Sequence, residues 1–234
     1  MRVAVTKLMV CLANSRKHLG RCVAGIAIGR DGPQWIRPVS GRPGHEVSPA
    51  ERQYGGGVEP QVLDVVSVSL VGARPFGIHR ENWLLDPTIR WRRVGRIAWH
   101  ELCDFEETPD MLWVDGYDTS TGLNDRVPVE QEPLVVDSIT LIRVAEVTIE
   151  VSRAHPLSVK SSEVKARFRY AGSAYALKVT DPVYEERFRA KGLGKYRLGE
   201  SFLTVSLTEA FRDNFFKVVA AVVERPVAES GGRR

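Results

Sequence analysis

The stretch from Ser15 to Ser40 holds residues whose types and spacing suit the binding of a phosphate beside a ring. A basic segment, residues 15–21, leads into an apolar run, and a second polar group follows in W-I-R-P-V-S at 35–40. Arginine and lysine near an aromatic ring commonly hold phosphates while a base stacks on the ring. The candidate binding residues are Arg16, Lys17, Arg21, Trp35, Arg37 and Ser40. The alternative is a solvated hairpin with a buried tryptophan.

Asn82 and Trp83 complete this first candidate site and belong to a basic and aromatic arm, residues 74–99. In that role the Asn82 amide reads a base edge and the Trp83 ring stacks. Basic and aromatic residues interleave along the arm as they do along a single-stranded nucleic-acid track. The alternative for Trp83, and for most aromatic residues of the arm, is packing over a core.

A second group of cations lies at alternate positions in V-K-A-R-F-R-Y-A, residues 164–171. This alternation is typical of a β-strand, so Lys165, Arg167 and Arg169 share one face and the apolar residues share the other. Such a row predicts a phosphate-binding face. The alternative is a plain polar face, because one side of an antiparallel sheet is often solvated.

Local signals place these residues on strands and loops. In the first half, apolar and β-branched runs predict strands at 2–12, 21–28, 34–39 and 62–71. A helix begins at Ser48, with Pro49 at its first position and Glu51 at its third. In the second half we expect strands at 139–151, 164–171, 175–180, 202–207 and 215–223, and a helix at 181–189.

The order of strand, strand, strand, helix, strand, strand is that of the OB-fold, a five-stranded Greek-key barrel. We therefore predict an all-β (β-rich α+β) protein of two tandem OB-like five-stranded barrels with short helices. Residues 1–138 form the first barrel with the arm and an insert at 98–138, and residues 139–226 form the second. Residues 227–234 are expected to be a disordered tail.

Charge is distributed unevenly along the 234 residues, whose net charge is +4. Residues 1–97 carry a net charge of +8, residues 98–138 carry −10 and residues 139–234 carry +6. Basic lobes suit a polyanionic partner through counterion release. The acidic insert is most simply a solvated loop. A sharper hypothesis is that it lies over a basic groove and competes with nucleic acid.

The motifs of common enzymes and metal sites are missing from the sequence. It contains no G-x-S-x-G, no H-E-x-x-H and no full Walker loop. The best enzymatic case places Lys17 or His18 beside Cys22, but Cys22 lies in an apolar strand pattern, where an inert thiol is usual. We therefore expect no catalytic residues, no metal and no cofactor.

Cysteine usage and hydropathy predict a cytoplasmic protein. Cys11, Cys22 and Cys103 are odd in number and widely spaced, which favours reduced thiols. No apolar run approaches the roughly 18 residues that span a bilayer, and residues 1–12 lack the features of a signal peptide. We expect no membrane partner.

Several longer strings resemble a bacterial family named for a dual OB-containing domain. They are N-S-R-K (14–17), G-R-C-V-A-G-I (20–26), W-I-R-P-V-S (35–40), E-N-W-L-L-D-P (81–87), A-R-F-R-Y-A-G (166–172), V-T-D-P-V-Y-E (179–185) and L-G-E-S-F-L-T-V-S-L (198–207). The resemblance spans nearly the whole chain. It implies the fold and does not imply a particular activity. OB-folds mostly bind nucleic acids or oligosaccharides.

The first functional hypothesis is therefore a module that binds single-stranded DNA or RNA, with its basic and aromatic site on the first barrel and no catalysis of its own. Bacterial chains of this kind could serve DNA repair or phage defence. The alternative is a sensor of a nucleotide or small phosphorylated ligand, or a weak enzyme acting on one. A third hypothesis is a scaffold that contacts a protein partner through the acidic insert.

Overall fold

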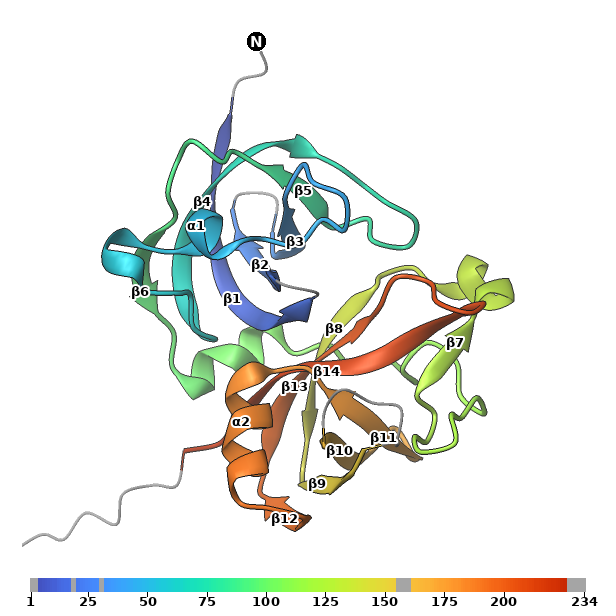
Figure 1. Ribbon diagram of the computed structural model, residues 1–234. Coiled ribbons are helices and arrows are strands. Elements are labelled where there is room, and N and C mark those ends of the chain that lie inside the picture. Colours follow the sequence, from blue (N-terminus) through green and yellow to red (C-terminus); the bar gives the residue numbers. More distant parts are fainter. Residues whose placement is uncertain (1–3, 18–19, 30–31, 155–160, 227–234) are drawn as a thin grey trace, which may run out of the picture.

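The computed structural model describes residues 4–17, 20–29, 32–154 and 161–226. Two β-barrels lie one above the other in Figure 1, and a segment of short 3₁₀ helices and loops runs beside the lower one. The tail expected to be disordered, residues 227–234, lies outside the described residues, as does part of the loop at 15–21.

The first barrel is a closed OB barrel. Its strands are β1 (Val5–Lys17), β2 (Gly20–Ile28), β3 (Gln34–Val39), β4 (Asp64–Ala73) and β5 (Asn82–Leu85). They pair in the order β1-β2-β3-β5-β4, and β4 returns to pair with β1, while β3 and β5 run parallel. A sixth strand, β6 (Arg92–Arg96), adds to β4. The order predicted through the fourth strand is confirmed, whereas β5 and β6 lie in the arm, where no strand was predicted.

Between β3 and β4 lie the helix α1 (Pro49–Arg52) and the 3₁₀ turn η1 (Gly55–Gly57). The predicted helix start at Ser48 is confirmed, since the Ser48 backbone N–H donates to the Glu51 carboxylate at 2.8 Å. Gly25 on β2 allows the barrel to close tightly, because a Cβ there would lie 1.9 Å from the Val10 carbonyl oxygen.

The second barrel repeats this plan. Its elements are β8 (Ile139–Val144), β9 (Val147–Arg153), β10 (Ser162–Tyr170), β11 (Ser173–Val179), α2 (Pro182–Ala190), β12 (Gly194–Leu198), β13 (Ser201–Leu207) and β14 (Asn214–Glu224). The strand expected at 139–151 is divided by Ala145 and Glu146 into β8, which pairs with β13, and β9, which pairs with β10. The two halves together therefore act as the first strand of the barrel, and β11 and β14 run parallel like β3 and β5.

Helix α2 occupies the position expected between the third and fourth strands of this barrel. It begins with Pro182 at its first position, and the Asp181 carboxylate accepts hydrogen bonds from the backbone of Val183 at 2.9 Å and Tyr184 at 3.3 Å. Asp181 thus satisfies two backbone donors that the first turn of a helix leaves open. The prediction of this helix from its capping residues is confirmed.

The acidic insert is folded onto the second barrel. It contains η2 (Trp99–Phe105), β7 (Arg126–Pro128) and η3 (Val129–Leu134). Strand β7 pairs with β14, and Leu123 exchanges backbone hydrogen bonds with Ala176 of β11 at 3.3 and 3.0 Å. A simple solvated loop does not describe this segment, because its backbone bonds to two strands of the second barrel.

The two barrels share one apolar seam. Met9, Cys11 and Val23 point into the first barrel, so their neighbours along β1 and β2 point outward. Val10, Leu12 and Ile26 on that outer side pack against residues of the second barrel in a buried cluster completed by Ile97, Leu102, Leu141 and Phe202. Each fully buried side chain of this kind stabilises the folded chain by roughly 1.5–3 kcal/mol. The outer face of the first barrel is therefore part of the core.

Candidate nucleic-acid interface

Arg37 lies inside the seam between the barrels. Its side chain is 7% exposed, and its Nη2 lies 2.8 Å from Glu81 Oε1. The same nitrogen donates to the Ser206 hydroxyl at 3.1 Å, and Nη1 lies 2.9 Å from His79 Nδ1. Ser138 donates to Glu81 at 2.7 Å. Arg37 is thus a buried ionic partner that joins elements of both barrels.

The ionisation of this cluster follows from its surroundings. Burial alone raises the pKa of the Glu81 carboxyl, but the Arg37 charge, His79 and the Ser138 hydroxyl outweigh it and lower the pKa to about 2. Burial also lowers the pKa of His79 below its ordinary value of 6.5. At neutral pH the cluster therefore holds one ion pair, Arg37 with Glu81, beside a neutral imidazole.

Trp35 and Ser40 are also held within the protein. The Trp35 ring packs against the seam cluster that contains Val10, Leu12 and Ile26. It also packs against a smaller buried cluster, in which Ala13 and Ala24 of the first barrel meet Ile139 and Ala220 of the second. Its Nε1 donates to Glu107 Oε1 of the insert at 3.1 Å. Ser40 is fully buried, and its hydroxyl accepts from the Arg42 backbone N–H at 3.3 Å. Neither arrangement presents a free ring face or a free hydroxyl at an open groove.

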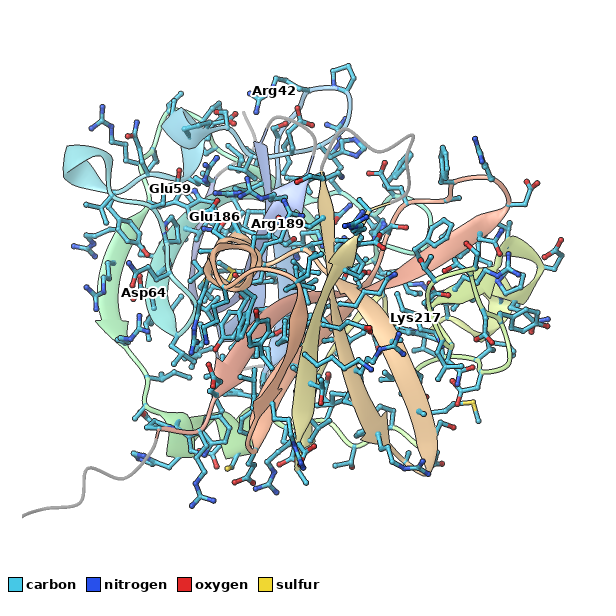
Figure 2. All side chains as sticks on the ribbon, turned by 60° about the horizontal axis from the view of Figure 1, so that its bottom comes forward. Arg42, Glu59, Asp64, Glu186, Arg189 and Lys217 are labelled. Atoms are coloured by element: carbon cyan, nitrogen blue, oxygen red, sulfur yellow. The ribbon has the colours of Figure 1, made fainter. Side chains whose placement is uncertain are left out.

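The three cations near the β1–β2 turn meet carboxylates. Arg16 Nε lies 2.9 Å from Glu185 on α2, and its Nη2 pairs with Glu186. Lys17 Nζ lies 2.7 Å from Glu209, and Arg21 Nε lies 3.9 Å from Glu59. The charges of Glu59 of the first barrel and Glu186 of α2 both act on Arg21, and Figure 2 labels these two carboxylates close together. Arg16 and Lys17 therefore join the two barrels by ion pairs, whereas Arg21 pairs within the first barrel.

Asn82 and Trp83 lie on β5 beside Arg37, since β5 runs parallel to β3 with Arg37 opposite Asn82. Asn82 is 3% exposed, and its Oδ1 has no hydrogen-bond partner among the described residues. Trp83 packs against the first core, with Lys7 Nζ 4.5 Å from its ring centroid. Trp35, Arg37, Arg16 and Lys17 thus lie in the seam or at its edge, whereas Trp83 packs on the core of the first barrel. The eight candidate residues do not line one open groove.

The corresponding face of the second barrel is open. On β9, β10 and β11 the inward residues, such as Ile149, Phe168 and Leu177, form the barrel core. The outward residues include Lys165, Arg167 and Arg169 of β10, as the alternation predicts. Across the sheet Lys165 lies opposite Lys178. Lys165 is only 5% exposed, whereas Arg167 is half-buried and Arg169 and Lys178 are exposed. Three cations on two neighbouring strands therefore reach solvent on this outer side.

A groove of about 760 Å³ lies on this face. It is lined by Ser120, Thr121, Gly122, Glu150, Ser152, Arg153, Ala154, Glu163, Lys165 and Arg167. Lys165 Nζ lies 2.7 Å from Glu163, and Arg167 pairs with Glu150. Arg169 donates to the Gly172 carbonyl at 2.8 Å, at the end of the same strand. Cations outnumber carboxylates here, so the groove suits an anion.

The acidic insert forms one wall of the groove with uncharged residues, 120–122. Its nearby carboxylates are engaged within the fold: Asp125 accepts from Thr119 at 2.7 and 2.6 Å, and Asp115 accepts from the Tyr175 hydroxyl at 2.8 Å. The insert therefore shapes the groove, and these two carboxylates do not cover its cations.

Both barrels have the strand order of an OB-fold, and this agrees with what is known of related chains. The family model described as "Dual OB-containing domain" matches residues 7–222. The chain belongs to this family. No curated protein and no solved structure matches it significantly. Membership of the dual OB-containing domain family accounts for the fold. It does not identify a ligand, so the evidence for one comes from the surface of this chain.

The sequence predicted the row of cations on β10. It did not predict that the corresponding face of the first barrel is buried in the seam. A signal was present: residues 8–13, L-M-V-C-L-A, are apolar at consecutive positions, whereas a strand with one solvated face alternates. It also missed Lys178 and Arg153. The tight turn at Gly172 sets the register that brings Lys178 opposite Lys165. The position of Lys178 could therefore have been predicted from the sequence.

Two observations concern metal binding and membrane insertion. Among the residues that the structure describes, no group of three or more His, Cys, Asp or Glu is arranged to hold a metal ion. Within the same ranges, no helix has the length and apolar character to cross a membrane.

Proposed function

We propose that this member of the dual OB-containing domain family binds single-stranded nucleic acid on the open face of its second barrel. The observation that carries the proposal is the contrast between two equivalent faces. OB-folds bind oligonucleotides on the face of their second and third strands. In the first barrel that face is buried in the seam, whereas in the second barrel it is open and cationic.

The contacts of the groove describe how a strand would be held. Arg167 and Arg169 are the cations of β10 nearest to solvent, and exposed Lys178 of β11 extends the row across the sheet. Lys165 is buried and paired with Glu163, so it adds positive charge below the groove rather than a direct contact. Since no aromatic residue lines the groove among the described residues, phosphate contacts supply most of the affinity. Binding should therefore tolerate changes of sequence and fall steeply with salt.

Fluorescence anisotropy with labelled 12-nucleotide DNA and RNA strands, at several salt concentrations, tests the proposal. The variant is Arg167→Ala/Arg169→Ala. A matched control, Arg90→Ala/Arg92→Ala, removes two exposed arginines from the arm of the first barrel. Each phosphate contact contributes about 0.7 to the salt slope for a single strand. The β10 variant should lose about 1.4 of slope and at least tenfold in affinity at low salt, while the control retains both.

Other outcomes would overturn the proposal. No binding of either strand by the wild type at low salt would refute it outright. Binding lost in the arm variant and kept in the β10 variant would move the site to the first barrel. Saturable binding of mononucleotides with a shallow salt slope, without binding of longer strands, would favour the ligand-sensor alternative.

A further inference from the structure

The acidic insert contains a second hollow, of about 360 Å³. It lies between residues 107–113 and the segment 134–140 that leads into β8. Met111, Leu134 and Val136 line it and are 48%, 59% and 66% exposed. Large apolar side chains that gather at one exposed hollow commonly mark a site of protein interaction.

The walls of this hollow are already fixed. Trp113 lines it, and its Nε1 donates to the Asp137 carbonyl oxygen on the opposite wall at 2.6 Å. At the inner end, Glu107 Oε2 accepts from the Leu141 backbone N–H at 2.9 Å. A site that is formed before its partner arrives avoids part of the ordering cost of binding.

Negative charge surrounds the apolar residues. Glu107 and Asp137 line the hollow, and Asp110 is adjacent to Met111 in the chain. The Glu107 carboxylate accepts from two uncharged donors, Trp35 Nε1 and the Leu141 backbone N–H. Among the described residues, Asp110 and Asp137 have no ion pair. Burial raises the pKa of nearby Tyr170, and the charges of Glu106, Asp110 and Glu107 add to this increase. Asp110 and Asp137, which are both exposed, are therefore available to cations of a partner.

We propose that this hollow is a docking site for a basic segment of a partner protein. One large apolar side chain of the segment would fill the space between Met111, Leu134 and Val136. Lysine or arginine on either side of it would meet Asp110 and Asp137. Charge complementarity selects this occupant, because the insert carries a net charge of −10 and repels acidic segments. The site is separate from the groove on β10 and does not depend on nucleic-acid binding.

Panning of a random 12-residue peptide phage library against the purified full chain tests the inference. The expected enrichment is of peptides with a large apolar residue flanked by lysine or arginine. An enriched peptide is then synthesised and titrated against three variants. Leu134→Glu/Val136→Glu alters the hollow, and Asp110→Lys/Asp137→Lys reverses the charge of its rim. The control, Ile89→Glu/Val94→Glu, alters residues of the first barrel that are 50% and 52% exposed.

We expect both variants of the hollow to weaken the peptide at least tenfold and the control to bind it as the wild type does. Unchanged thermal denaturation would show that the variants remain folded. Enrichment of acidic peptides, or of none, would overturn the inference. Equal binding of the selected basic peptide by all variants would overturn it too, because the peptide would then occupy another surface.

Discussion

The ion pair between Arg37 and Glu81 should be a principal source of stability at the seam. Glu81→Gln keeps the size of the side chain and removes its charge, which leaves the Arg37 guanidinium buried beside a neutral imidazole. The pKa of Glu81 is about 2 against an ordinary value of 4.5, and this difference corresponds to about 3 kcal/mol at neutral pH. Removal of one partner from a buried pair costs a similar amount, roughly 3–5 kcal/mol.

The sign of the pH dependence follows from the lowered pKa of Glu81. A group whose pKa is lower in the folded state stabilises that state above its unfolded pKa and loses this contribution as pH falls through its folded pKa. The contribution of Glu81 should be complete above about pH 5, about half of it should remain at pH 3, and almost none at pH 2. The difference between wild type and variant should shrink in the same window.

Urea denaturation at pH 7 and pH 3, monitored by tryptophan fluorescence, measures the loss of unfolding free energy in Glu81→Gln and its dependence on pH. At pH 7 a loss of about 3 kcal/mol should lower the urea midpoint by roughly 1–3 M, because the slope of unfolding free energy against urea is roughly 1–3 kcal/mol/M. Glu146→Gln is the control, since Glu146 pairs with Arg197 at an exposed site and its loss should leave the midpoint unchanged. The reasoning is refuted if Glu81→Gln behaves like the control, or if its deficit is the same at both pH values.

Two further predictions concern the second barrel. Glu150→Gln should raise the affinity for a single strand several-fold at low salt, because it frees Arg167 from its carboxylate partner; anisotropy would check this, and unchanged or weaker binding would contradict it. Burial lowers the pKa of Lys217 to about 8 against an ordinary 10.5, even though Asp115 lies 3.4 Å away. The unfolded chain then binds more protons than the folded one, so the wild type should gain stability between pH 8 and 10.5. Lys217→Met should abolish that gain in urea denaturation, and an equal gain in both proteins would argue against the assignment.

Strands and helix starts were predictable because their signals are local. The alternation at 164–171 gave β10, and Asp181 with Pro182 gave α2, since a cap acts on backbone groups two or three residues away. The repeated order of elements then indicated two OB barrels, which the family match and the structure bear out. The division of the strand at 139–151 was missed, because each half takes a different partner strand.

The sequence by itself determined which residues are cationic, which strands they occupy and which neighbours share a face. Only the tertiary structure decided which of the two OB faces is open. Trp35 and Arg37 have the chemistry of a binding site, but Glu107, Glu81 and Ser206 come from distant parts of the chain and enclose them in the seam. The physical reason is that local signals act over a few residues, whereas the seam forms because two barrels bury apolar faces together that neither buries alone.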